Sequence, residues 1–264
     1  MSNGTENLFA EERREQITEY VKKHGKVTVQ QLCDVFGVSS ATIRNDLREL
    51  DRQRQLVRTH GGALGRSQTR YEVDIDHRSV EAREAKQAIA AAAVTRIDAG
   101  DTIILDTGTT TLELAKVLSQ VHNLTVVTND LRIALVLESY PNVQVIVTGG
   151  RLRDGFHCTV GSGGRAMLDT LSVDKAFMGA NSFSPEFGAS TPDLDTADTK
   201  KAMIAIADTT VLLADSRKFE QTSLARFAVV EDIDVLVTES ISDSYRVAVE
   251  QAGIEVVNAS LGSG

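Results

Sequence analysis

The sequence predicts an α/β protein in which a small helical N-terminal unit precedes a larger domain built on a parallel sheet. After residue 100, apolar β-branched runs alternate with helix-length segments, which is typical of a parallel sheet flanked by helices. Before residue 65, apolar residues recur with the 3.6-residue period of short amphipathic helices. We expect a first domain over residues 1–64, a polar linker over 65–77, a second domain over 78–258 and a tail over 259–264.

Composition excludes several classes of protein. The chain has 264 residues, of which 42% are hydrophobic, so it can bury real cores. It shows neither a signal peptide nor an apolar run long enough for a bilayer, which predicts a cytoplasmic protein without a membrane partner. The two cysteines, Cys33 and Cys158, are too few for a disulfide framework or a four-cysteine zinc site. The five histidines lack metal-ligand spacing, and we expect neither a metal site nor a cofactor.

Charge is distributed unevenly along the chain. The formal net charge is -9, but the residues through Arg66 carry about +2 and the remainder about -11. Six arginines and only three acidic residues fall between Thr42 and Arg66. Any contact with nucleic acid is therefore expected in the N-terminal unit.

Two helices are predicted to open this unit. The first runs from about Phe9 to His24 and is ended by Gly25. The second fits the segment VTVQQLCDVF, with Thr28 as N-cap and Gly37 as the turn that stops it. The residues expected to face inward are Ile17, Tyr20, Val21, Leu32, Val35 and Phe36.

A third helix and a hairpin complete the unit. Ser39 or Ser40 caps the helix, and its buried stripe is expected to be Ile43, Leu47 and Leu50. That stripe turns the residues Ala41, Thr42, Arg44, Asn45 and Arg48 outward. The segment LVRTHGGAL then predicts a short hairpin turned at Gly61 and Gly62.

This arrangement is the layout of a winged helix-turn-helix: two helices with a tight glycine turn, followed by a hairpin wing. An ordinary three-helix bundle is the alternative, but the third helix has few acids near its start and carries side chains suited to base edges and phosphates. DNA binding is therefore the favoured interpretation. The predicted DNA-contacting residues are Ser40, Thr42, Arg44, Asn45, Arg48, Arg58 and His60.

The second domain is predicted to begin with a helix over about Glu81 to Ile97. Seven strands, expected to be buried on both faces, follow as DTIILD, LTVVT, VQVIVTG, DKAFMGA, TVLLAD, IDVLVT and IEVVN. Helices are expected over TTLELAKVLSQ, DLRIALVLESY, DTKKAMIAIAD and SDSYRVAVEQA.

Polar or glycine-rich residues follow three of these strands. In DTGTTT, Gly108 would let the backbone approach a ligand, and the hydroxyls and amides of the next three residues would lie at the positive end of a helix dipole. A plain strand-to-helix turn is the alternative for this loop alone. Because ligands gather at the carboxyl ends of strands in open α/β sheets, three such ends favour an anion-binding site. Its residues are Gly108, Thr109, Thr110, Thr111, Thr128, Asn129, Gly149, Gly150 and Arg151.

Longer segments resemble a known family. VSSATIRNDLRELDRQRQLVRTHGGAL resembles the N-terminal signature of DeoR-family regulators, which runs V-S-x-x-T-[IL]-R-x-D-L and ends at H-G-G-A. The segments DTIILDTGTTTLELA, VVTND, VIVTGG, DKAFMGAN, TKKAM and LLADSRKF resemble successive blocks of that family's effector domain. The resemblance implies a second domain similar in fold to ribose-5-phosphate isomerase and the CoA transferases. It also implies a repressor of a sugar-catabolic operon that responds to a phosphorylated intermediate.

The matching blocks imply further ligand contacts. Lys200 and Lys218 would act as point charges on a phosphate, and Asp106, Asp215 and Asn181 would contact sugar hydroxyls. The implied partners are double-stranded operator DNA, a small sugar phosphate and further copies of the chain in a homodimer or homotetramer. The glycine-rich stretch VGSGGRAM lacks nucleotide-loop spacing and is given no ligand role.

Two other functions stay open at this point. The first is a sugar-phosphate isomerase or transferase carrying a DNA-binding domain, with a carboxylate base among Asp106, Asp195, Asp198 and Asp215. Asn181 stands where that enzyme would want a carboxylate, which favours a sensor without catalytic residues. The second is a redox sensor acting through Cys33, which has no basic neighbour to activate it.

Overall fold

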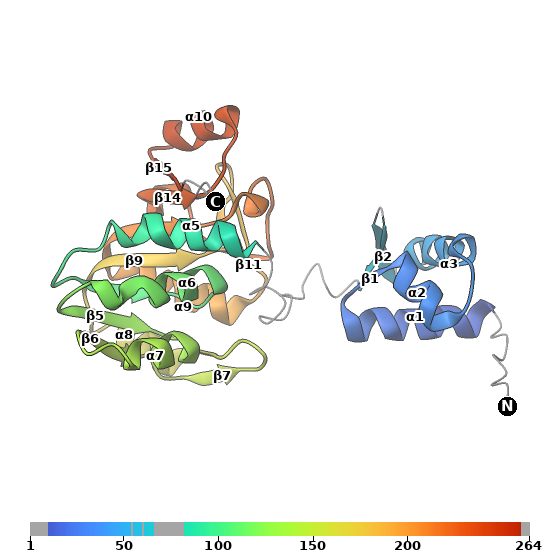
Figure 1. The fold of residues 1–264 in the computed structure, drawn as a ribbon, viewed down its shortest axis with the longest axis horizontal. Coiled ribbons are helices and arrows are strands. Elements are labelled where there is room, and N and C mark those ends of the chain that lie inside the picture. The colour runs from blue at the N-terminus through green and yellow to red at the C-terminus, as the bar shows by residue number, and fades with distance from the viewer. Residues whose placement is uncertain (1–9, 54, 60, 66–81, 260–264) are drawn as a thin grey trace. The chain divides into compact units, whose positions relative to one another are not determined.

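The computed structural model describes residues 10–53, 55–59, 61–65 and 82–259 (Figure 1). The chain divides into two compact units, Met1–Val73 and Asp74–Gly264. Most of the expected linker 65–77 and of the expected tail 259–264 lies outside the described residues, so those boundaries stay predictions.

The described residues of the first unit form three helices and a small antiparallel sheet. The helices are α1 (Ala10–His24), α2 (Val29–Phe36) and α3 (Ser40–Arg52). The strands are β1 (Lys26–Thr28), β2 (Leu56–Thr59) and β3 (Gly62–Gly65), in the order β1-β3-β2. The helices and the hairpin enclose a core that contains Ile17, Val21, Leu32, Ile43, Leu47, Leu50 and Leu56.

Capping side chains fix the ends of α2 and α3. Thr28 and Gln31 form a capping box at the start of α2, and Gly37, at φ 65°, ends that helix in the left-handed region. The hydroxyl of Ser39 accepts a hydrogen bond from the amide of Thr42 at 3.2 Å, so Ser39 rather than Ser40 caps α3. These caps set the tight turn between the two helices.

Three details of the first unit differ from the sequence prediction. Val35 was expected to face inward but is 50% exposed, because Leu32 and Phe36 carry the contact of α2 with the core. The hairpin pairs Thr59 with Gly62, so Gly62 is a strand residue and the turn lies one residue earlier than predicted. The strand β1 was not predicted; it pairs with β3, and a side chain at Gly62 would collide with the backbone oxygen of Val27.

The second unit is built on a seven-stranded sheet in which every pairing is parallel. Its order is β15-β14-β12-β9-β4-β5-β6. The strands are β4 (Thr102–Leu105), β5 (Leu124–Thr128), β6 (Val143–Val147), β9 (Val173–Gly179), β12 (Ala207–Leu213), β14 (Val235–Thr238) and β15 (Glu255–Asn258). Each corresponds to one predicted run, which confirms the expected fold class.

Helices cover both faces of this sheet, and Figure 1 shows α5, α6 and α7 together on one of them. On that face lie α5 (Arg83–Val94), α6 (Thr109–Val117) and α7 (Leu131–Glu138). The opposite face of the sheet has its own hydrophobic core. The helices that pack against that core are α8 (Ser162–Leu168), α9 (Leu194–Ala205) and α10 (Asp243–Gln251). Strand residues alternate between the two cores, as Ile103, Ile104 and Leu105 do in β4. The expectation that all strands are buried on both faces is wrong for the edge strands β6 and β15, in which every residue is partly or fully exposed.

Several short elements at the strand ends were not predicted. They are the hairpin of β7 (Arg151–Arg153) with β8 (Cys158–Val160) and the small sheet of β10 (Ser182–Ser184), β11 (Gly188–Thr191) and β13 (Ala225–Ala228). The 3₁₀ turns are Leu118–Gln120, Ser216–Lys218 and Val230–Asp232. The small sheet packs its apolar side into the core that α8, α9 and α10 share.

Candidate functional site

The outer face of α3 carries most of the predicted DNA-contacting residues. Ser40, Arg44, Asn45 and Arg48 are exposed there, whereas Thr42 is half-buried because its amide and hydroxyl bond to the cap Ser39. Arg58 is exposed on β2 of the wing. His60 lies outside the described residues. The structure therefore brings four of the predicted residues onto one helix face.

Asn45 and Arg48 are joined to each other on this face. A guanidinium nitrogen of Arg48 donates to the amide oxygen of Asn45 at 2.9 Å. Within the described residues, no carboxylate forms an ion pair with Arg48, so its positive charge remains available to a phosphate. By contrast, Arg52 one turn later donates two hydrogen bonds to Glu49, at 3.1 and 2.7 Å. The positive charge of Arg48, which no described carboxylate compensates, thus lies beside the side-chain amide of Asn45.

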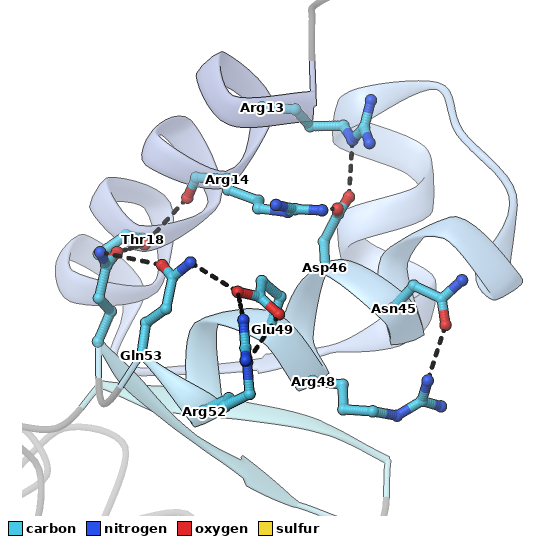
Figure 2. A network of polar contacts seen from close by, with 10 residues as sticks. Arg13, Arg14, Thr18, Asn45, Asp46, Arg48, Glu49, Arg52 and Gln53 are labelled. Carbon is cyan, nitrogen blue, oxygen red and sulfur yellow. Dashed lines mark hydrogen bonds and ion pairs between the residues drawn. The ribbon is translucent and has the colours of Figure 1, made fainter.

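The inner face of α3 holds a charge that sequence reasoning missed. Asp46 is 2% exposed and accepts hydrogen bonds from Arg13 at 2.7 Å and from Arg14 at 3.0 Å, both from α1 (Figure 2). Asp46 falls on the buried stripe between Ile43 and Leu50, and an acid on an apolar stripe requires a cationic partner. That position in the sequence was the signal that could have identified the pair.

In the second unit, the predicted ligand residues follow neighbouring strands at the carboxyl edge of the sheet. Leu105 pairs with Thr128, and Thr128 pairs with Val147, so the residues after β4, β5 and β6 lie side by side. Asp106, Asn129 and Thr148 come at these three strand ends, and each is at most 1% exposed.

Each of these three side chains has one buried polar atom without a hydrogen-bond partner among the described residues. The atoms are Oδ1 of Asp106, Oδ1 of Asn129 and Oγ1 of Thr148. The other polar atom of the Asn129 side chain is bound, since the amide nitrogen donates to the carbonyl oxygen of Thr159 at 2.9 Å. An unpartnered buried polar group is costly, so three on adjacent strands make this edge a candidate site for a polar ligand. Thr148 was not among the predicted site residues.

Lys200 is paired with Asp106 rather than exposed at the edge. Its ammonium group donates to Oδ2 of Asp106 and to the carbonyl oxygen of Gly179 at 2.9 Å, and its side chain is 4% exposed. Gly179 also donates its amide to Oδ2 of Asp106 at 2.9 Å. Burial raises the pKa of Asp106, and the charge of Lys200 and these hydrogen bonds oppose that rise. Lys200 therefore compensates a buried carboxylate.

The start of α6 lies beside these strand ends. Gly108 is its N-cap, and Thr109, Thr110 and Thr111 are buried in its first turn. The hydroxyl of Thr111 donates to the carbonyl oxygen of Gly108 at 3.0 Å, so it serves the helix itself. The amides of a helix N-terminus favour an anion there.

A carboxylate that sequence reasoning missed ties this loop to the next one. Asp130, the N-cap of α7, accepts a hydrogen bond from the hydroxyl of Thr107 at 2.9 Å and is also bound by Arg132. The buried thiol of Cys158 also bonds to Thr107, and burial raises the pKa of that thiol to about 11. A neutral thiol at ordinary pH gives no support to a reactive cysteine here.

After β6 the chain turns sharply through two glycines. Gly150 has φ 135°, and a side chain there would approach the carbonyl oxygen of Val160 to 2.6 Å, so the position requires glycine. Arg151 begins β7, and its side chain is 67% exposed and paired with Asp195 at 2.7 Å. The structure thus directs Arg151 toward α9.

The ends of β9 and β12 carry the remaining predicted residues. Asn181 accepts a hydrogen bond from Thr191 at 3.1 Å on the small sheet. Asp215 is 1% exposed and accepts a hydrogen bond from Arg217 at 2.8 Å. Although burial raises the pKa of Asp215, the Arg217 hydrogen bond and the charges of Lys218 and Lys86 lower it below its usual value. Asp215 therefore keeps its charge among three cationic side chains.

Two classes of feature are missing from the described residues. They contain no group of three or more His, Cys, Asp or Glu side chains that could hold a metal ion. None of the helices in the described ranges has the length and apolar character that crossing a bilayer requires.

Comparisons with known proteins cover almost the whole chain. Residues 13–69 match the DeoR-like helix-turn-helix domain, and residues 81–240 match the DeoR C terminal sensor domain. The chain is 36% identical over 252 residues to the HTH-type transcriptional regulator GlpR of Haloferax volcanii, covering 95% of this chain and 98% of that protein. It is 34% identical to a putative aga operon transcriptional repressor of Escherichia coli O157:H7, with 93% of each chain covered.

The comparisons with solved structures are weaker. A D-ribose-5-phosphate isomerase in complex with phospho-erythronic acid aligns with a TM-score of 0.40 at 20% identity, over 52% of this chain and 54% of that one. The eIF2B delta subunit of Chaetomium thermophilum aligns with a TM-score of 0.44 at 17% identity, over 64% and 59% of the two chains. The sequence matches, which span both units, show that this chain belongs to the DeoR family of DNA-binding transcription regulators.

Proposed function

We propose that this protein represses a sugar-catabolism operon and leaves its operator when a phosphorylated sugar binds at the carboxyl edge of the sheet. The observation that carries the ligand proposal is the set of unpartnered atoms on Asp106, Asn129 and Thr148. Two of these atoms can only accept hydrogen bonds, so the matching ligand must offer donors, as sugar hydroxyls do. The start of α6 offers a place for the phosphate, and Lys218 beside Asp215 is the cation that the sequence predicts for it.

The DNA-contacting set of this proposal consists of the residues predicted from the sequence on α3 and the wing. Arg44, Asn45 and Arg48 are exposed on one face of α3, as direct base readout in a major groove requires. Relatives with repressor names support repression: the HTH-type transcriptional repressor GlcR of Bacillus subtilis is 31% identical over 251 residues. A protein that acts on operator DNA works in the cytoplasm, and a two-fold operator calls for a homodimer or homotetramer.

A sensor is favoured over an enzyme because each candidate base is paired with a cation. Asp106 is held by Lys200 and Asp215 by Arg217, while Asp195 and Asp198 are about half-exposed and lie in ion pairs with Arg151 and Lys201. A general base needs a basic oxygen within reach of the substrate carbon, and a paired cation lowers the basicity of a carboxylate, which favours binding without turnover.

The test is a thermal-shift screen of sugar phosphates on the full chain, with ribose 5-phosphate included, run beside an assay for turnover. A ligand at 100 times its dissociation constant should add about 2.7 kcal/mol of stability. We expect a sugar phosphate to raise the unfolding temperature of the second unit without being converted. Turnover of the stabilising ligand would favour the enzyme instead, and no stabilisation by any sugar phosphate would contradict the assigned ligand class.

A further inference from the structure

The contact of Arg14 on α1 with Asp46 on α3 places Arg14 near the candidate DNA-reading residues Asn45 and Arg48. A surface hollow on the first unit is lined by Arg14 of α1 together with Asn45, Arg48, Glu49, Asp51 and Arg52 of α3. Arg14 reaches it across the gap between the two helices, with its Nε on Oδ1 of Asp46 at 3.0 Å (Figure 2). The hollow is therefore formed by two helices, and Arg14 is the residue that α1 contributes to it.

The charges in the hollow favour an anion. Its lining contains three arginines and two acids. Glu49 accepts hydrogen bonds from Arg52 and Gln53, and these bonds lower the pKa of Glu49. The negative charge of Glu49 is therefore already balanced by Arg52 of the same helix. One oxygen of Asp51 accepts a hydrogen bond from the backbone amide of Arg58 at 3.2 Å. Arg14 acts on Glu49 through its charge and donates its hydrogen bond to Asp46, whereas Arg48 bonds to Asn45 and to neither of these two acids.

Asp46 determines where the Arg14 guanidinium lies. The carboxylate of Asp46 binds two guanidinium groups, so the trio of Arg13, Arg14 and Asp46 keeps a net charge of about +1. Arg13 is 12% exposed in this trio and Arg14 is 30% exposed. Arg13 is absent from the lining of the hollow. The excess charge is thus available to solvent mainly through Arg14.

We propose that Arg14 binds a DNA backbone phosphate beside the base-reading face of α3, and that Asp46 is the positioning residue that holds it there. The proposal rests on the proposed docking of α3 in the major groove. Arg48 would contact one phosphate from α3, and Arg14 would contact another from α1. Two phosphate contacts from two helices would fix the rotation of α3 about its own axis. Phosphate contacts of this kind set register and orientation, while the base contacts carry the sequence information.

The experiment measures operator affinity against salt concentration for Arg14→Gln and for a matched control, Arg13→Gln. Both variants remove one of the two guanidinium groups from Asp46, so both are expected to lower the unfolding temperature of the first unit. Only Arg14→Gln should reduce the slope of log affinity against log salt, by about 0.9, which is the loss of one phosphate contact. The same loss should be seen on random DNA, because a phosphate contact is independent of sequence.

Arg14→Lys tests the same contact in a chain that keeps the charge. A lysine can act as a point charge on a phosphate, so this variant should recover most of the slope while it loses the geometry of the guanidinium. It also keeps the test valid should Arg14→Gln fail to fold. Equal slopes for wild type, Arg14→Gln and Arg13→Gln would overturn the inference and leave Arg14 a purely structural partner of Asp46.

Arg48→Ala separates this inference from the docking proposal. If Arg48→Ala lowers the slope and Arg14→Gln does not, the docking of α3 stands and the role of Arg14 is refuted. If neither variant lowers it, the proposed docking face is itself wrong, and the inference falls with it.

Discussion

The two units of this protein treat buried carboxylates in opposite ways. In the first unit, both oxygens of Asp46 are bound by arginines of another helix, and the result is a fixed relation between α1 and α3. In the second unit, Asp106 has one oxygen bound by Lys200 and Gly179, while its other oxygen has no partner among the described residues. A buried carboxylate with both oxygens bound holds a surface in place, whereas one with an open oxygen can accept a further hydrogen bond from a ligand.

This difference matches the two kinds of recognition that a regulator needs. DNA is bound by exposed side chains on a rigid helix, so the buried groups beneath that helix should be fully paired. A small ligand is bound within the protein, so some of its partners must be left open in its absence. The predictions below test this contrast, beginning with the largest expected effect.

Lys200→Met should be the most destabilising single change in the second unit. It leaves the Asp106 carboxylate buried without a cation, which costs about 3–5 kcal/mol at pH 7. The matched control is Lys201→Met, because Lys201 is 56% exposed and makes only a 3.8 Å surface ion pair with Asp198. Chemical denaturation of both variants measures the contrast. Similar small losses would show that the Asp106 pair contributes little.

The same variant has a predicted pH dependence. Burial already raises the pKa of Asp106 in the folded state, and removal of the cation should raise it further. A group with a raised folded-state pKa binds more protons when folded, so its stabilising effect is lost as the pH rises. The deficit of Lys200→Met relative to wild type should therefore shrink as the pH falls from 7 toward about 4, near the unfolded pKa of aspartate. A deficit independent of pH would point to lost packing instead.

Gly62→Val should disable the first unit and leave the second intact. A side chain at Gly62 collides with the backbone oxygen of Val27, and backbone cannot move aside as a side chain could. Overpacking typically costs about 1–3 kcal/mol, and a clash with backbone is expected at or above the upper end of that range. Gly61→Ala is the control, since a Cβ at Gly61 meets nothing within 4 Å. Operator binding should vanish in the valine variant, with thermal unfolding of the second unit unchanged.

Asn45→Ala should reduce specificity more than affinity for DNA in general. A side-chain amide that reads a base contributes about 1–3 kcal/mol of discrimination. The variant should lose that amount on the true operator and much less on random DNA, as measured by competition gel shifts. Equal losses on both DNAs would show that Asn45 contacts no base.

Thr148→Val should have the smallest effect on stability, and in the unusual direction. The hydroxyl of Thr148 has no partner among the described residues, so an isosteric methyl group should stabilise the free protein by about 1 kcal/mol while weakening ligand binding. Thr159→Val is the matched control, because its hydroxyl donates to the carbonyl oxygen of Thr148 at 2.8 Å and its loss should destabilise. Destabilisation by both variants would mean that the Thr148 hydroxyl is satisfied in solution.

Much of this fold could be predicted because its main signals are local. Each strand of the large sheet has an apolar β-branched run, and Thr28, Gly37 and Ser39 mark the ends of α2 and α3. The strands β10 and β11 were missed because SFS and GAST are short and mostly polar, and only their packing against the core makes them strands. Local signals do not carry that information.

The candidate sites were harder to predict than the fold. The outward residues of α3 follow from its helical period, but the pairing of Asp46 with Arg13 and Arg14 joins positions more than 30 residues apart. Lys200 lies against Asp106, 94 residues away, a contact that was not predicted, and its expected role toward a phosphate stays a prediction. The Lys200 contact depends on which strands of the sheet become neighbours, and the sequence contains no local trace of that order.

The most direct test of the account is a gel-shift titration of the operator complex with the sugar phosphate found in the thermal screen, for wild type and Lys218→Ala. Induction requires that the ligand binds one conformation better than the other, so a protein with a weakened ligand site should keep its operator affinity and resist release. We expect Lys218→Ala to bind operator as wild type does and to need a much higher ligand concentration for release. Release of Lys218→Ala at the wild-type concentration would contradict the account, because the ligand would then act from another site.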